Sequence, residues 1–127
     1  MVGRNLVENP RMKAFDLLTP SRYDLDLLNF EGVESYLMQV KPDLIVHAAG
    51  RVGGIQANMK NPVAFLVENL DINRNLILAA RKVGVRRLLN LGSSCMYPRN
   101  AENPLRESMI LQGELEPTNE GYALAKI

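Results

Sequence analysis

The feature that most constrains the fold is a nearly unbroken apolar run at residues 43–49. Leu44, Ile45 and Val46 lead into a histidine and two alanines, and Gly50 follows directly. A run this apolar is typical of a strand covered on both faces, and such strands occur mainly in parallel sheets flanked by helices. The sequence therefore favours the α/β class.

Helical patterns lie on both sides of this run. Apolar residues at helical spacing predict a helix over residues 30–40, which Lys41-Pro42 ends, and a long helix over residues 62–83. Asn61 and Pro62 are an N-cap and a first-turn proline, and Gly84 is a typical C′ residue. Helices in this position between strands predict a doubly wound parallel sheet.

Further elements are shorter. Residues 13–18 read as a short strand that stops at Thr19-Pro20, and residues 86–91 read as another buried strand. Residues 1–8 are expected to be helical, and residues 21–27 to be a polar connection or a minor strand. Gly53-Gly54 follows the end of the apolar run and indicates a loop, with a plain turn as the alternative. Residues 99–119 show no periodicity, and Pro117 is expected to begin the last helix.

Composition excludes several classes of protein. The net charge of +1 gives no broad attraction to nucleic acid or anionic lipid. One cysteine and one histidine cannot form a disulfide or a zinc site of the usual type. No apolar run approaches the ~20 residues of a membrane span. We expect at most one domain, a cytoplasmic location and no metal.

The residues most suggestive of chemistry are Ser93, Tyr122 and Lys126. Ser93 follows the apolar run that ends at Leu91, and Tyr122 and Lys126 are four apart, so a helix presents them on one face. A lysine ammonium one turn from a tyrosine favours the phenolate, which can exchange a proton with a carbonyl or alcohol oxygen. The serine hydroxyl can hold the same oxygen by a hydrogen bond. The plain alternative is a surface tyrosine and lysine that share a helix face by chance.

These residues, together with the sequence HAAG after the central strand, resemble the extended short-chain dehydrogenase/reductase family of nucleotide-sugar enzymes. Three longer strings resemble the GDP-L-fucose synthases within that family. They are AGRVGGI at residues 49–55, LGSSCMYP at residues 91–98 and LQGELEPTNEGYA at residues 111–123. The resemblance covers all of the chain. It implies a Rossmann-like fold that is incomplete here, with residues 1–127 forming a partial dinucleotide-binding domain.

The resemblance also implies a reaction and a substrate. GDP-4-keto-6-deoxy-D-mannose would be epimerised at C3 and C5, and its C4 ketone would then be reduced to give GDP-L-fucose. Ser93 and Tyr122 would stabilise the C4 oxygen, and Cys95 would move protons at the ring carbons. The family pairs this cysteine with a histidine, which we expect beyond Ile127. Ser93, Ser94 and Cys95 would contact the substrate.

The implied cofactor is NADP(H). Lys126 would tune Tyr122 and hydrogen-bond the nicotinamide ribose. The other cofactor contacts that the resemblance implies are Gly3, Arg22, Ala48, Ala49, Leu91, Gly92, Ser93 and Ser94. We expect a first strand and a glycine-rich turn before Met1, so the chain by itself should bind NADPH weakly or not at all. The full-length enzyme is expected to be a homodimer.

Simpler roles remain open for several of these residues. Cys95 could be a small buried side chain. His47 lies inside the apolar strand and fits a packing role better than a catalytic one. Arg22 could be a solvated loop arginine. For the whole chain, the alternatives are a part of another sugar-nucleotide epimerase or dehydratase, and a non-catalytic module that binds a partner.

Overall fold

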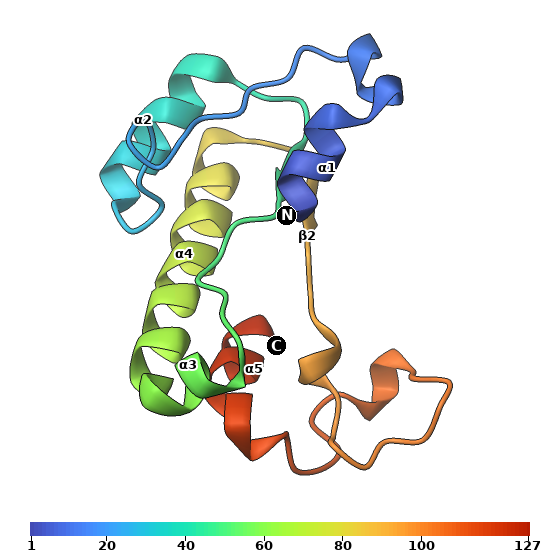
Figure 1. Ribbon diagram of the computed structural model, residues 1–127. Coiled ribbons are helices and arrows are strands. Elements are labelled where there is room, and N and C mark those ends of the chain that lie inside the picture. The colour runs from blue at the N-terminus through green and yellow to red at the C-terminus, as the bar shows by residue number, and fades with distance from the viewer. The chain divides into compact units, whose positions relative to one another are not determined.

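The computed structural model describes all residues, 1–127. The chain folds into two compact units (Figure 1). The first unit contains residues 1–49 and 75–90, and the second contains residues 50–74 and 91–127. Helix α4 (Pro62–Val83) contributes to both, since its residues up to 74 belong to the second unit and its residues from 75 on belong to the first.

The first unit contains a small parallel sheet. Strands β1 (Ile45–His47) and β2 (Leu88–Asn90) are paired in parallel, with Ile45 opposite Leu88 and His47 opposite Asn90. These strands lie within the two segments predicted to be buried strands, residues 43–49 and 86–91, although each is shorter than its segment. The α/β class and the parallel pairing are confirmed.

Helix α2 (Phe30–Val40) and the end of α4 enclose the core of this unit. The Asn29 side chain caps α2 by accepting a hydrogen bond from Gly32 N–H, and Lys41 ends the helix in a left-handed conformation. Gly84, with φ +86°, ends α4 in the same region of backbone space. The bounds of both predicted helices are confirmed, whereas the predicted N-cap role of the Asn61 side chain stays a prediction.

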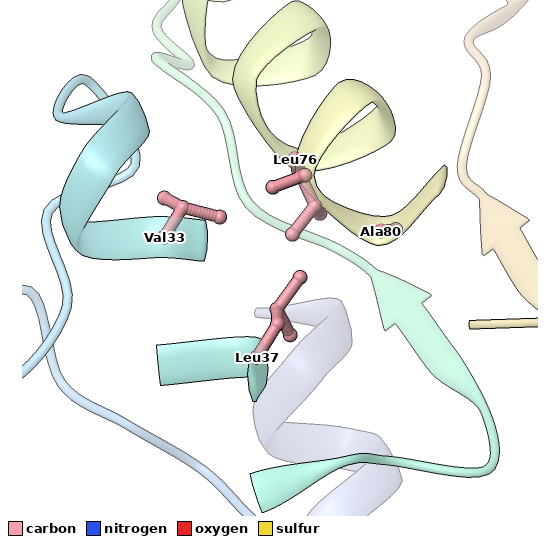
Figure 2. Close-up of a cluster of buried hydrophobic side chains, with 5 residues drawn as sticks. Val33, Leu37, Leu76 and Ala80 are labelled. Carbon is pink, nitrogen blue, oxygen red and sulfur yellow. The ribbon is translucent and has the colours of Figure 1, made fainter. Parts of the chain in front are cut away.

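The buried apolar cluster between them is aliphatic (Figure 2). Figure 2 shows side chains of α2 and α4 pointing toward one another. The members of the cluster are Val33, Leu37, Leu76, Ala79 and Ala80.

The prediction of a strand at residues 13–18 is wrong. The segment begins as the last residues of a 3-10 helix, η1 (Pro10–Ala14), which follows helix α1 (Val2–Glu8). Asn9 accepts a hydrogen bond from Arg11 N–H and Pro10 occupies the first helical turn, so the local signal is that of a helix start. Phe15 and Leu18 after it are exposed, and no neighbouring strand pairs with them.

The second unit is helical and contains many turns. Its elements besides α4 are α3 (Ile55–Lys60), α5 (Glu120–Lys126) and the 3-10 helices η2 (Ser94–Met96), η3 (Glu107–Met109) and η4 (Pro117–Asn119). The prediction that Pro117 begins the last helical segment is confirmed. Helix α3 was not predicted. The two glycines before it indicated a loop or turn, and the helix that begins directly after Gly54 is only six residues long.

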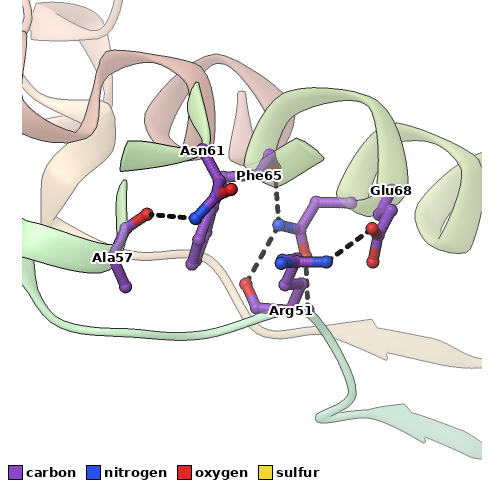
Figure 3. Close-up of polar contacts among 6 residues, drawn as sticks. Arg51, Ala57, Asn61, Phe65 and Glu68 are labelled. Carbon is purple, nitrogen blue, oxygen red and sulfur yellow. Dashed lines mark hydrogen bonds and ion pairs between the residues drawn. The ribbon is translucent and has the colours of Figure 1, made fainter. Parts of the chain in front are cut away.

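A polar cluster fixes the loop between β1 and α3 to helix α4 (Figure 3). The Asn69 side chain accepts a hydrogen bond from Arg51 N–H at 2.8 Å and donates to the carbonyl oxygens of Arg51 at 3.0 Å and Phe65 at 2.7 Å. The Arg51 guanidinium pairs with Glu68 and lies 5.2 Å from the centre of the Phe65 ring. The loop is therefore held by side-chain hydrogen bonds as well as by close packing of Gly53 against the buried Phe65 ring.

No helix of the chain combines the length and the apolar character needed to cross a membrane.

Candidate active site

The turn at Ser93 is built by local hydrogen bonds. Ser93 is the N-cap of η2, and its Oγ accepts a hydrogen bond from Cys95 N–H at 3.3 Å. Ser93 N–H donates to the sulfur of Met96 at 3.3 Å. A Cβ atom at Gly92 would lie 3.0 Å from that sulfur, so glycine lets the methionine side chain fold back over the turn. Ser93 and Cys95 therefore lie on a tight, defined turn.

The start of helix α5 is also fixed by local hydrogen bonds. Glu116 accepts hydrogen bonds from the backbone N–H and the hydroxyl of Thr118, and Pro117 occupies the first position of η4. Tyr122 and Lys126 follow on α5, with the Lys126 amine 6.0 Å from the centre of the Tyr122 ring. The prediction that the two side chains share a helix face is confirmed.

Two contacts join α5 to the segment around η2, against which it packs. The Asn119 side-chain amide donates to the Cys95 sulfur at 3.1 Å, and the Lys126 amine donates to the Leu91 carbonyl oxygen at 3.2 Å. These contacts lie at opposite ends of α5, and Tyr122 lies between them in the chain. The structure thus brings together the two sequence segments that carry the predicted catalytic residues.

Lys126 is almost entirely removed from water, with 8% of its surface exposed. Burial lowers the pKa of its ammonium, because desolvation disfavours the charged form. A Cβ atom at Gly50 would lie 3.8 Å from the Lys126 nitrogen, so the amine also lies close to the loop after β1.

A cavity of about 240 Å³ lies beside Tyr122. It is lined by residues 117–122 together with Asn58, Met59 and Pro62, and neither Ser93 nor Cys95 belongs to its lining. Asn119 lines the cavity and also contacts the Cys95 sulfur. A Cβ atom at Gly121 would lie 2.7 Å from the Pro62 carbonyl oxygen, so only glycine allows α5 to approach the start of α4 this closely.

The remaining predicted cofactor residues belong to the first unit. Gly3 lies on α1, where a Cβ atom would be 3.8 Å from the Ala48 side chain, an ordinary contact. Ala48 and Ala49 are exposed after β1. Arg22 is exposed in a turn that Asp24 stabilises. Hydrogen bonds from the Ser21 hydroxyl and N–H lower the pKa of the Asp24 carboxyl. The roles of these residues stay predictions.

His47 is 2% exposed, which agrees with the packing position expected for it. No group of three His, Cys, Asp or Glu side chains is arranged to hold a metal ion.

The sequence did not identify the asparagines whose side chains hold the turns of the second unit. Asn119 contacts Cys95, Asn69 holds the Arg51 loop, and Asn58 donates to the Gly53 and Gly54 carbonyl oxygens. The one available signal was the position of Asn69. Asparagine is a poor helix former, yet Asn69 lies at helical spacing among the apolar residues of the helix predicted over residues 62–83.

Comparison with known proteins gives a consistent result. The model of the NAD dependent epimerase/dehydratase family matches residues 1–127. A GDP-L-colitose synthase from Yersinia pseudotuberculosis is 55% identical over 127 residues, which are 100% of this chain and 41% of that protein. A GDP-L-fucose synthase from Azorhizobium caulinodans is 48% identical over 126 residues, which are 99% of this chain and 40% of that protein.

Among solved structures, a GDP-mannoheptose C4 reductase from Campylobacter jejuni with NADP bound has a TM-score of 0.89 and 36% identity. The match covers 98% of this chain and 37% of that one. The chain therefore spans about two fifths of the length of the curated relatives it matches.

Proposed function

Because this chain belongs to the NAD dependent epimerase/dehydratase family, we propose that its full-length protein uses NADPH to convert a GDP-linked keto sugar. The substrate proposed first is GDP-4-keto-6-deoxy-D-mannose and the product is GDP-L-fucose. The observation that carries the proposal is the double attachment of α5 to the Leu91–Cys95 segment, through Asn119 and Lys126. Relatives named for GDP-L-fucose and GDP-L-colitose synthesis support the choice of a GDP-sugar.

The proposed chemistry depends on the C4 ketone of the sugar. A ketone acidifies the hydrogens on the neighbouring C3 and C5 carbons, because the carbanion is delocalised as an enolate. Cys95 is proposed to remove and return these protons, and the half-buried thiol is the only cysteine of the chain. Loss of the proton from carbon leaves the enolate oxygen as the atom that needs stabilisation.

Ser93 and Tyr122 are proposed to stabilise that oxygen. Ser93 Oγ accepts a hydrogen bond from Cys95 N–H, so its own O–H proton remains available to donate. Tyr122 would then give its proton to the same oxygen during reduction. Both residues act as donors to an oxygen that gains charge, which is the arrangement that stabilises such a transition state.

The residues of the second unit fit a nicotinamide cofactor. The Lys126 ammonium has three N–H donors, of which one is directed at Leu91, so donors remain for ribose hydroxyls. Leu91, Gly92, Ser93 and Ser94 are proposed to form the wall beside it. Gly3, Arg22, Ala48 and Ala49 of the first unit are proposed as further contacts. NADPH, when bound, supplies the hydride for C4.

A second candidate substrate follows from the relative with 55% identity, which is named for GDP-L-colitose. Colitose is 3-deoxyfucose, so the corresponding keto sugar lacks the C3 hydroxyl. The proposed residues act on either sugar, and an assay with both substrates separates the two candidates.

Self-association into a homodimer is also part of the proposal. Val63, Val67 and Leu70 are spaced for one face of α4, and between 45% and 71% of each residue is exposed. An exposed apolar stripe on a long helix supports burial against a second copy.

The test uses the full-length protein and its Cys95→Ser variant. In D₂O with GDP-4-keto-6-deoxy-D-mannose, mass spectrometry measures deuterium incorporation at C3 and C5, and absorbance measures NADPH oxidation. Deuterium incorporation in the variant should fall by roughly 10²- to 10⁴-fold, the usual contribution of an acid/base group. Reduction of a sugar that is already epimerised should fall far less.

Exposed Ser108→Ala is the control and should change neither rate. Equal loss of both activities in Cys95→Ser would contradict the role of the thiol. If the unaltered protein turned over neither keto sugar, the proposed function itself would be wrong.

A further inference from the structure

Asn119 does not do what its position in the chain would suggest. It is the N-cap residue of α5, where an asparagine side chain ordinarily accepts a hydrogen bond from the first turn of the helix. Here the side chain makes no capping bond. Its amide is directed at the sulfur of Cys95, at 3.1 Å.

The other end of the same amide has no partner in the chain, a state that it shares with the Oδ1 atom of Asn58. Asn119 Oδ1 is buried and accepts no hydrogen bond from the chain. Buried acceptors are rarely left unpaired because the desolvation cost is not recovered, so such an atom calls for an explanation.

The unit also contains amides that are locked in one orientation. Asn69 uses both ends of its amide, since Oδ1 accepts from Arg51 N–H and Nδ2 donates to two carbonyl oxygens. Asn58 donates to the Gly53 and Gly54 carbonyl oxygens, so its nitrogen end is fixed. Rotating either amide by half a turn would oppose oxygen to oxygen. The Asn119 amide has one side-chain partner, the Cys95 sulfur, so either orientation of the amide leaves one of its ends unpaired.

We propose that Asn119 is the positioning residue of Cys95, with an amide that turns its N–H toward the thiolate and its C=O toward the thiol. The inference rests on the proposed function, in which Cys95 alternates between these two states. When the thiolate takes a proton from carbon, a C–H bond breaks, an S–H bond forms and the electron pair stays on the sugar as the enolate. Asn119 gains and loses no proton.

The carboxamide is suited to this role because it is neutral and carries both a donor and an acceptor. The hydrogen bond to the thiolate is charge-assisted and is the stronger of the two. Asn119 therefore holds the sulfur in place in both states and favours the reactive one. The other titratable groups on α5, the helix packed against η2, are Glu120, Tyr122 and Lys126, and the test variants leave all three unchanged.

The test measures alkylation of the single cysteine of this chain by iodoacetamide from neutral to alkaline pH. The thiolate is the form that reacts. Asn119→Asp keeps the shape of the side chain and removes the donor, and Asn119→Ala removes both groups. In each variant the rate at neutral pH should fall roughly tenfold, and the whole profile should move to higher pH, with the larger move in Asn119→Asp.

Thr118→Ala is the matched control, because Thr118 precedes Asn119 on the same turn and its hydroxyl contacts Glu116. Its profile should coincide with that of the unaltered chain. A change in access alone multiplies the rate equally at every pH and leaves the midpoint of the profile unmoved. An unmoved midpoint in both Asn119 variants would overturn the proposal.

A second measurement needs no Asn119 variant. The side-chain N–H signals of Asn119 in an ¹H–¹⁵N spectrum should change with pH in the unaltered chain and stay constant in Cys95→Ala. Constant signals in both proteins would also overturn the proposal. Neither experiment uses a sugar or a cofactor, so a negative result in the deuterium assay beside a positive result here would contradict the proposed function alone.

Discussion

The two units of this chain are stabilised by different means. The interior of the first contains a cluster of aliphatic side chains from α2 and α4, centred on Val33, Leu37 and Leu76, beside the buried polar residues His47 and Asn75. The interior of the second includes Asn58, Asn69 and Lys126, each hydrogen-bonded to backbone groups of distant or neighbouring turns. Its buried apolar residues are few and mostly small.

This difference follows what each unit must provide. Aliphatic packing is non-directional and contributes stability in proportion to the area it buries. A hydrogen bond fixes distance and angle, and a buried one is costly to leave unmade. The residues proposed to carry the chemistry lie in the unit whose turns are held by directional contacts.

The largest effect is expected from the first unit. Leu37 is 3% exposed, and Leu37→Ala should lower the free energy of unfolding by about 2–5 kcal/mol, through lost burial and a residual cavity. Urea unfolding measures the change, and hydrogen exchange should show it in residues 30–40. Met38 is the next residue of the same helix and is 49% exposed, so Met38→Ala should cost little. Equal costs for the two variants would break the distinction drawn here.

The same contrast explains what the sequence could predict. The helices over residues 30–40 and 62–83 follow from periodicity and capping residues, which are local. The parallel pairing follows from two apolar runs joined by a helix. Tyr122 and Lys126 share a face because helical spacing requires it. The helices and the shared face need only residues close together in the chain, and the pairing needs only the α/β pattern of the segments between residues 45 and 90.

Other features depend on partners that sequence alone does not identify. Asn119 and Cys95 are joined across the long loop, and Asn69 on α4 reaches Arg51 in the loop after β1. The segment at residues 13–18 looked like a strand by composition, but a strand needs a neighbour to pair with, and Asn9-Pro10 begins a 3-10 helix instead. Composition alone cannot supply such a neighbour.

A smaller loss of unfolding free energy is expected when a polar side chain in the interior of the second unit is replaced. Asn69→Leu has a similar shape but leaves Arg51 N–H and C=O without their buried partner, so it should cost about 1–3 kcal/mol. Asn100→Leu, at an exposed loop position, is the control and should be near neutral. Hydrogen exchange should show faster opening of residues 50–54 in Asn69→Leu alone. A neutral or stabilising Asn69→Leu would mean that shape, rather than hydrogen bonding, holds this loop.

The smallest expected effect is a pH dependence of the unfolding free energy, which should arise from Lys126 in the second unit and not from the aliphatic cluster of the first. Burial lowers the pKa of Lys126 in the folded chain, whereas the unfolded chain has the ordinary lysine value near ~10.4. Between these two values the unfolded chain binds the proton that the folded chain has released, so stability rises with pH. Below the folded value both forms are charged, and the full cost of burying the ammonium opposes folding.

The difference in unfolding free energy between the unaltered chain and Lys126→Met should therefore change in favour of the unaltered chain as pH rises from neutral toward alkaline. Urea unfolding at a series of pH values measures this difference. Lys60→Met, at an exposed position on α3, should give a flat difference over the same range. A flat curve for Lys126→Met as well would mean that the Leu91 carbonyl replaces water around the ammonium in full. The aliphatic cluster of the first unit has no titrating member, so Leu37→Ala should show no such dependence.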